Sequence, residues 1–327
     1  MRKLMRFALA PLVAAVAIAA PALAQQQPTT VQFGLVAKLA LSWPMFMAYD
    51  RGIFTEYGIK PEFVVMGNSS KVIQGLASGT FQMGHAGIPD AIRGTEQGAP
   101  VKIIGSETAL PPYRWNAAPS IKKVADLKGK KIMLGGSKDI TFIYWKVLAE
   151  KNGLSISDFE YVYAGATTAR FAALLSGAVQ ATLLAQPFDF QAASQGFPAF
   201  ATQKDYTPDS PFTVYATNSE WAAKNKNLVV AFLKGYLRGT ALFYDPANRK
   251  EAIDILIKET GAKPDDAEKT YDLYAKDMKP FRTDGAMTDA AMTDILKSLV
   301  MLEDLKEPVP PASKYYDDSY LKLARGK

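Results

Sequence analysis

One segment of this chain occurs twice, and the second copy follows the first by 98 positions. Each copy has a glycine, two hydroxyl residues shortly after it, and then a leucine, a serine–glycine pair, a glutamine and a proline. The first copy contains Gly67, Ser69, Ser70, Leu76, Ser78, Gly79, Gln82 and Pro89, and the second contains Gly165, Thr167, Thr168, Leu174, Ser176, Gly177, Gln180 and Pro187. The repeat predicts two similar lobes with a cleft between them. In each lobe the hydroxyl residues start a helix, whose first N–H groups have no partner within the helix.

The first 24 residues have the pattern of a secretory signal peptide. Basic residues at positions 2, 3 and 6 precede an apolar stretch over residues 7–20, and Ala22 and Ala24 supply a small-residue cleavage signal. We expect cleavage after Ala24 and a mature chain that begins at Gln25. The apolar stretch is too short for a permanent anchor, and no later run approaches the roughly 20 apolar residues that span a bilayer. We therefore expect a soluble mature protein.

Charge and cysteine content exclude several classes of protein. Without the three cations of residues 1–24, the formal net charge falls from +6 to +3, which removes the main support for nucleic-acid binding. The absence of cysteine excludes a disulfide scaffold, a thiolate nucleophile, a cysteine-ligated metal and a lipid-modified cysteine at the mature N-terminus. Because an exported protein without an anchor is retained only between two membranes, we expect a periplasmic location.

Apolar runs and turn residues alternate as in a two-lobed α/β protein. In the first half, strands are expected over residues 31–36, 62–66, 81–84 and 101–108, with helices over 44–51, 70–77 and 89–97. In the second half, strands are expected over 131–134, 159–163 and 179–184, with helices over 139–151 and 169–175. A strand over 213–217 returns the chain to the first lobe, and helices follow over 228–244, 247–260, 265–274 and 288–305.

This alternation predicts a mostly parallel sheet flanked by helices in each lobe. A mature chain of 303 residues (327 minus 24) suits two domains. We place the first lobe at residues 25–112 and 213–327 and the second lobe at 113–212, with two hinge crossings between them.

Six short motifs carry a resemblance to a known family. They are AYDRGIF at 48–54, LASG at 76–79, VADLKGKK at 124–131, LLSG at 174–177, QPF at 186–188 and DPANR at 245–249. In this order they resemble the periplasmic binding proteins of ABC importers for nitrate, sulfonates, taurine and thiamine-pyrimidine precursors, over nearly the whole mature chain. The resemblance implies a type II fold whose two lobes close over a small-molecule ligand. It also implies a monomer that delivers the ligand to a permease and its ATPase, meets the membrane only through that permease, and has no catalytic activity and no cofactor.

The chain departs from this family at three glutamines. Gln82 and Gln180 stand where the family usually has Asp, and Gln186 stands where an acidic residue often precedes the proline. The fold is unaffected. The third change puts in doubt any ligand, such as a cationic amine, that needs a carboxylate at residue 186.

Hydroxyl residues at three predicted helix starts are the first candidates for ligand binding: Ser69 with Ser70, Ser137, and Thr167 with Thr168. Unpaired N–H groups and the positive end of a helix dipole attract anions, so three such ends at one cleft favour an anionic ligand. The alternative is ordinary N-capping, for which Ser and Thr are common.

Three cations are the next candidates. Lys138 and Arg170 occupy first turns of helices, where the dipole opposes a cation unless an anion binds. Arg114, near the crossover, could donate a bidentate pair of hydrogen bonds to a carboxylate or sulfonate. The alternative for each is a solvated surface charge.

The remaining candidates are two aromatics, one amide and one imidazole. Trp43 follows the first strand at its carboxyl end, where open α/β sheets bind ligands, and is expected to stack on a planar ligand. Phe188 and Gln186 flank the proline of the second repeat. His85, the single histidine, either binds the ligand or is structural, and it lacks the companions that a metal site requires.

We therefore expect a binder of a small organic anion of the sulfonate, carboxylate or nitrate type, including aromatic acids. A pyrimidine of the thiamine-precursor type is the alternative ligand. A related eukaryotic group makes that pyrimidine by consuming its own histidine, but it uses a cysteine-rich iron-binding segment that this chain lacks. The chain also has no nucleophile elbow and no nucleotide-binding loop, so we do not expect an enzyme.

Overall fold

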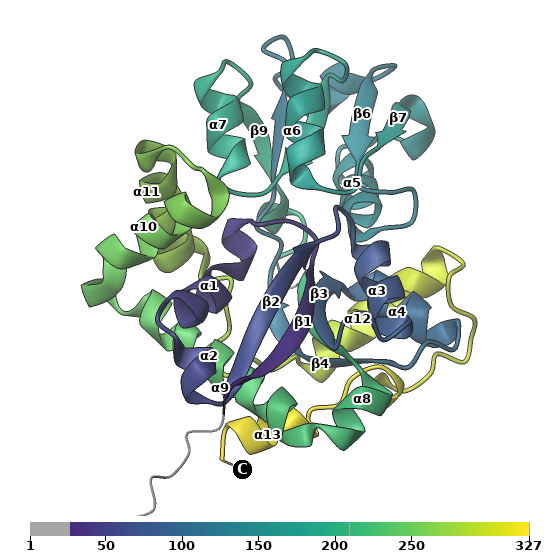
Figure 1. Ribbon diagram of the computed structural model, residues 1–327. Helices are drawn as coiled ribbons and strands as arrows, with labels where there is room; N and C mark the ends of the chain where they lie inside the picture. The colour runs from purple at the N-terminus through teal and green to yellow at the C-terminus, as the bar shows by residue number, and fades with distance from the viewer. Residues whose placement is uncertain (1–26, 209, 327) are drawn as a thin grey trace, which may run out of the picture.

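The chain forms two α/β lobes, one above the other in Figure 1, and the computed structural model describes residues 27–208 and 210–326. The predicted signal peptide, residues 1–24, lies outside the described residues. The α/β class and the two mixed sheets flanked by helices agree with the fold predicted from the repeat.

The sheet of the first lobe has the strand order β2-β1-β3-β10-β4. Its strands are β1 (Thr29–Leu35), β2 (Ile59–Val65), β3 (Met83–Gly87), β4 (Val101–Thr108) and β10 (Thr213–Asn218). β1 pairs in parallel with β2 and β3, whereas β10 runs antiparallel between β3 and β4. The segment predicted to return the chain to this sheet does so.

The sheet of the second lobe repeats this plan in the order β7-β6-β8-β5-β9. Its strands are β5 (Arg114–Ala117), β6 (Lys131–Leu134), β7 (Glu160–Tyr163), β8 (Ala181–Leu184) and β9 (Ala199–Thr202). β6 is parallel to β7 and β8, and β5 is antiparallel to β8 and β9. In both sheets the antiparallel strand is therefore the one that has just crossed from the other lobe.

Helices cover the sheets and extend the first lobe. They are α1 (Trp43–Asp50), α2 (Ile53–Glu56), α3 (Ser69–Ala77), α4 (Ile88–Glu96), α5 (Ile140–Lys151), α6 (Thr167–Leu175), α7 (Phe188–Ser194), α8 (Ser219–Lys224), α9 (Lys226–Tyr244), α10 (Arg249–Thr260), α11 (Pro264–Asp272), α12 (Asp289–Met301) and α13 (Ser319–Ala324). Two of the C-terminal helices reach the second lobe: α11 contacts α7, and α12 lies near α5, where Tyr144 and Ile295 line one small opening. Among the described residues no helix has the length and apolar character to cross a membrane.

Two strands of the second lobe were not predicted from the sequence. β5 follows the Pro111-Pro112 pair and has only four residues, of which Trp115, Asn116 and Ala117 are buried without apolar–polar alternation. β9 is equally short, and its residues are all partly exposed. The prediction of a helix over 265–274 is also incomplete, because α11 continues as a π-helix over Leu273–Met278.

The two crossings between the lobes lie side by side and are hydrogen-bonded to each other. The hydroxyls of Thr108 and Thr213 are 2.7 Å apart, and the Phe212 N–H donates to the Thr108 carbonyl at 3.0 Å. The Gln203 N–H donates to the Tyr113 carbonyl at 2.9 Å. Paired crossings of this kind are where a hinge between two lobes would lie.

The two glycine turns of the repeat meet across that space. Gly67 has a φ of 80°, a left-handed conformation that favours glycine, and Asn68 follows it at the start of α3. A Cβ atom on Gly165 would lie 2.4 Å from the Cβ of Asn68 and 2.8 Å from the carbonyl oxygen of Gly67. Only a residue without a side chain fits at position 165 when the lobes are this close.

Substitution Gly165→Ala should therefore keep the lobes from reaching this arrangement. We expect affinity for a ligand found by thermal-shift screening to fall about tenfold or more, equivalent to about 1.4 kcal/mol, because both lobes must contact the ligand. Calorimetric titration measures the loss. Circular dichroism and the melting temperature of the ligand-free variant are the control, and they should match the parent protein because the clash lies between lobes. Unchanged affinity would show that the two turns do not need to touch.

Candidate ligand-binding site

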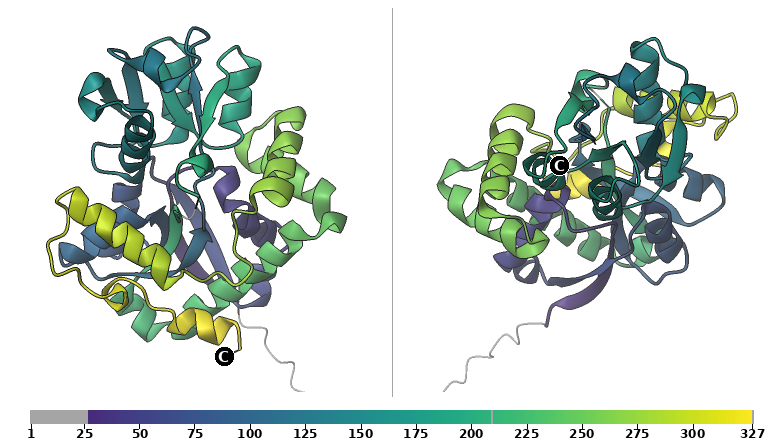
Figure 2. Two further views of the ribbon diagram at one scale, coloured as in Figure 1. Left: turned by 180° about the vertical axis from the view of Figure 1, so that it is seen from behind. Right: turned by 90° about the horizontal axis from the view of Figure 1, so that it is seen from above.

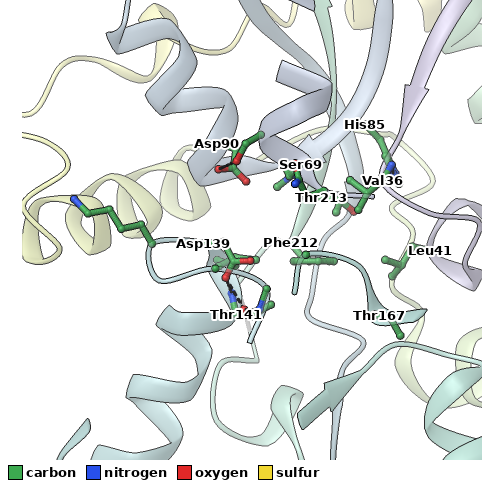
Figure 3. A pocket seen from close by; sticks show the side chains of 18 of the residues that line it. Val36, Leu41, Ser69, His85, Asp90, Asp139, Thr141, Thr167, Phe212 and Thr213 are labelled. Carbon is green, nitrogen blue, oxygen red and sulfur yellow. Dashed lines mark hydrogen bonds between the residues drawn. The ribbon is translucent and has the colours of Figure 1, made fainter. Parts of the chain in front are cut away.

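A cavity of about 360 Å³ lies between the lobes, and both lobes supply its walls (Figure 3). It lies beyond the carboxyl ends of β1, β3 and β6, the edge at which open α/β sheets bind ligands. The first lobe contributes Val36, Leu39, Leu41, Asn68, Ser69, Ser70, His85, Gly87, Asp90, Arg93 and Thr213. The second lobe and the hinge contribute Tyr113, Gly135, Gly136, Ser137, Lys138, Asp139, Ile140, Thr141, Gly165, Thr167 and Phe212.

The predicted hydroxyl residues are brought together at this cavity, with one exception. Ser69, Ser70, Ser137 and Thr167 line it, whereas Thr168 lines a neighbouring opening of about 300 Å³ together with Phe188. Neither Ser69 nor Thr167 caps its helix, because Asn68 and Ala166 occupy those positions. Their hydroxyl oxygens instead accept hydrogen bonds from the Gly87 N–H at 2.8 Å and the Arg170 guanidinium at 3.0 Å.

The three predicted cations are all paired within the protein, and only Lys138 lines the cavity, so the expectation for Arg114 and Arg170 is corrected. Arg170 is buried, and its guanidinium donates to the Leu183 and Gly165 carbonyls as well as to Thr167. The Lys138 ammonium lies 3.0 Å from an Asp304 oxygen. Arg114 is absent from the cavity wall and pairs with Asp189 at 3.3 Å. The carboxylates that pair with Lys138 and Arg114 are far away in sequence, so a local pattern could not reveal them, whereas Arg170 turns back to groups close to it in the chain.

Two carboxylates take the place of these cations, and sequence reasoning missed both. Asp139 is the N-cap of α5, where its Oδ1 atom accepts from the Thr141 N–H at 2.9 Å and the Phe142 N–H at 3.3 Å. Burial raises the pKa of Asp139. Asp90 lies in the first turn of α4, and its Oδ1 atom accepts from Ser70 and Arg93, each at 3.3 Å. The sequence signal for Asp139 was its position directly after Ser137-Lys138. A search for groups that bind anions does not consider carboxylates, so it missed this residue.

Trp43 lies in the core of the first lobe and not at the cavity, so the expected stacking role is wrong. The indole is fully buried beside Phe243 and Tyr271, and its N–H donates to the Ala252 carbonyl at 2.8 Å. Aromatic surface at the cavity comes from Tyr113 and Phe212 of the two hinge crossings, whose rings meet edge to face at 4.9 Å. The C-terminal helices that bury Trp43 lie two hundred residues away in sequence, which hides this packing from a local pattern.

His85 forms part of the cavity wall, but both of its ring nitrogens are occupied. The Val36 N–H donates to Nε2 at 2.7 Å, so the ring proton lies on Nδ1, which donates to Glu107 at 2.9 Å. Ser42 donates to the same carboxylate at 2.7 Å. The structural alternative for His85 is thus the one that its contacts support. Within the described residues, no group of His, Asp and Glu side chains is arranged to hold a metal ion.

Side-chain bridges connect the lobes on two sides of the cavity. On one side, Tyr274 donates to the Gln186 amide oxygen at 2.9 Å, and the Gln186 amide nitrogen donates to Asp189 at 3.1 Å. On the other side, Asp304 accepts from Arg93 at 2.7 Å and from Lys138 at 3.0 Å. Gln186 therefore connects the lobes and is absent from the cavity wall, contrary to its predicted role.

The Gln186 bridge contains a carboxyl that should respond to pH. Asp189 is fully buried, and burial raises its pKa to about 6 although Arg114 opposes the shift. The ordinary pKa of Asp is about 3.9, so below that pH Asp189 is protonated in both states and does not lower the free energy of unfolding. As the pH rises through about 6, ionisation of the buried carboxyl lowers the free energy of unfolding by up to about 3 kcal/mol.

Substitution Asp189→Asn should remove this pH dependence. Relative to the parent, the unfolding free energy of the variant should rise by up to about 3 kcal/mol between pH 4 and pH 7.5. Urea unfolding at a series of pH values measures the difference. A pH-independent difference between the two proteins would mean that Asp189 is ionised in the folded protein throughout this range.

Comparisons with known proteins place this architecture in a family. The NMT1/THI5-like family model matches residues 41–252. No sequence among the curated proteins matches this chain. Among solved structures, the periplasmic nitrate-binding protein NrtA from Synechocystis PCC 6803 is 13% identical, with a TM-score of 0.78 over 91% of this chain and 89% of that one.

Two further solved structures agree with this fold. The ligand-binding component of an ABC-type import system from Staphylococcus aureus, solved with zinc bound, is 15% identical, with a TM-score of 0.77 over 90% of this chain and 99% of that one. The alkanesulfonate-binding protein SsuA from Xanthomonas axonopodis pv. citri, bound to MOPS, is 18% identical, with a TM-score of 0.70 over 89% and 99%. These structures share the fold of this chain, and because the family model covers well over half of the sequence, the chain belongs to the NMT1/THI5-like family.

Proposed function

We propose that this protein is the solute-binding component of an ABC importer. The observation that carries the proposal is the cavity between two lobes of matching topology, with polar groups from both lobes on its walls. A solute held there is contacted by both lobes only when they are closed, so binding favours the closed state. The structural neighbours that are named as nitrate-, sulfonate- and import-system binding proteins support the same role.

The ligand that fits this cavity best is a small organic molecule. A volume of about 360 Å³ is within the range of small-molecule sites and much larger than a nitrate ion needs. The N-termini of α3 and α6 offer N–H donors to a carboxylate, sulfonate or carbonyl oxygen. Leu39, Leu41, Tyr113 and Phe212 offer an apolar surface for the body of the ligand. We therefore propose an organic solute with an oxygen acceptor at one end, as in organic acids and oxygen-bearing pyrimidines.

The proposal also covers location and partners. It includes export, cleavage after Ala24, a periplasmic location, a monomeric state and delivery to a permease with its ATPase. The signal-peptide pattern of residues 1–24 and the binding proteins among the structural neighbours support these points. Mass spectrometry of the protein from a periplasmic extract should find Gln25 as its first residue. Its recovery only from culture medium would contradict this location.

The enzyme alternative finds no support at the cavity. Consumption of the histidine would require access to the imidazole of His85, which is 1% exposed and holds both the Val36 N–H and Glu107. The named binding proteins among the neighbours also agree with a role in binding.

A thermal-shift screen of sulfonates, carboxylates, nitrate and pyrimidines tests the proposed function. A true ligand at 100 times its dissociation constant stabilises the folded state by about 2.7 kcal/mol, which raises the melting temperature by several degrees. The same ligand should reduce the radius of gyration in small-angle scattering. Tryptophan fluorescence is a poor reporter, since Trp43, Trp115 and Trp145 are fully buried away from the cavity. Tight binding without compaction would contradict the two-lobe mechanism.

A further inference from the structure

We propose that Asp90 and Asp139 act as a carboxylate pair, one from each lobe, which recognises a positively charged or NH-bearing group of the ligand when the lobes close. The inference rests on the proposed function and adds the chemistry of a second end of the same cavity. In Figure 3 the two side chains lie on the same side of the cavity, Asp90 from above and Asp139 from below.

Each member of the carboxylate pair keeps one oxygen for a ligand. The hydrogen bonds to Asp139 from Thr141 and Phe142 all end on Oδ1, and those to Asp90 from Ser70 and Arg93 also end on Oδ1. Among residues 27–208 and 210–326, no hydrogen bond ends on the Oδ2 atom of either side chain. Both residues line the cavity, and the Oδ2 atom of Asp139 lies beside Gly135, which also lines it. In this proposal, these two oxygens are the ones that a ligand would contact.

The cations nearest the carboxylate pair make most of their contacts with other groups. Arg93 donates to Asp304 through Nε at 2.8 Å and Nη2 at 2.7 Å, and it reaches Asp90 only through a single 3.3 Å contact. Lys138 also pairs with Asp304. Arg170 is turned toward the carbonyl groups of its own lobe. Asp304 thus pairs with Lys138 and shares Arg93 with Asp90, whose Oδ1 atom Arg93 contacts.

Closure brings these two negative groups toward each other in a partly dehydrated space. Like charges repel more strongly where water is displaced. A ligand with an ammonium, amidinium or amino group would relieve the repulsion and form charge-assisted N–H···O hydrogen bonds with both lobes. A ligand that is anionic throughout would add a third negative group. The carboxylate pair therefore selects for molecules that join a donor group to the acceptor end proposed above.

This arrangement also accounts for the departure at residue 186. Gln186 has no free carboxylate to offer, and its amide holds Tyr274 and Asp189. We propose that the acidic groups for a donor come instead from α4 and from the N-cap of α5.

A chemical double-mutant cycle tests the carboxylate pair. Two matched sets of probes differ only in the amino group: para-(aminomethyl)benzoate with para-methylbenzoate, and 2-aminoethanesulfonate with ethanesulfonate. Calorimetric titration should show that loss of the amino group lowers the affinity of the parent protein at least tenfold in the set that binds. The difference should disappear in Asp90→Asn and in Asp139→Asn. Equal affinities in the parent, or a difference that survives in both variants, would overturn the inference.

The N-cap role of Asp139 requires a matched control. Asp245 caps the turn at residues 246–248 by accepting from the Ala247 N–H at 2.9 Å, and it lies outside the cavity. Asn and Asp cap about equally well, so Asp245→Asn applies the same chemical change away from the ligand. The amino-group preference should persist in Asp245→Asn. If Asp245→Asn also loses the preference, the loss in the cavity variants is a general effect of the substitution, and the proposed recognition is wrong.

A ligand-free measurement decides the case if neither probe set binds. The double variant Asp90→Asn/Asp139→Asn lacks the repulsion, so its scattering should indicate a more compact average than that of the parent. An identical radius of gyration would overturn the inference. Compaction of the parent by purely anionic probes would also overturn the inference, but it would leave the proposed function intact. Failure of every screened compound to bind or compact the protein would instead refute the proposed function.

Discussion

The close contact between two helix-leading turns determines the geometry of this protein. Gly67 and Asn68 of the first lobe meet Gly165 of the second, and a single added methyl group at residue 165 would not fit. Since each turn leads into a helix whose first residues line the cavity, their contact brings the N-termini of α3 and α6 to one space. The two crossings between the lobes are joined to each other through Thr108 and Thr213.

The charged side chains around the cavity have partners that their positions in the sequence did not suggest. Arg93 and Lys138 are drawn to Asp304 at the rim, and Arg170 is used to hold the turn that precedes its own helix. The cavity itself therefore combines helix N-termini with two carboxylates. This mixture is the basis of our proposal of a ligand that carries both acceptor and donor groups.

The sequence predicted the fold more completely than the site. The repeat placed Gly67 and Gly165 in equivalent turns, and the alternation of strands and helices identified eight of the ten strands, because long apolar runs bounded by turn residues are local signals. β5 and β9 escaped because they have four residues each and no alternation. Trp43 and Gln186 were misplaced because their partners, Ala252 and Tyr274, lie in distant segments. Arg170 was misplaced because its side chain turns back to the Gly165 carbonyl of its own turn. Position along the chain shows that a residue ends a strand, but it does not show which way the side chain turns.

The central claim is that a ligand brings the two glycine turns together. Since the chain has no native cysteine, Ser78→Cys and Ser176→Cys would attach spin labels at two unique, exposed positions that correspond to each other in the repeat. Pulsed electron resonance then measures the distance between the C-terminal ends of α3 and α6. The account predicts a broad or longer distance distribution without ligand and a single shorter distance at saturation. An identical distribution in both conditions, with binding verified by calorimetry on the same sample, would contradict it.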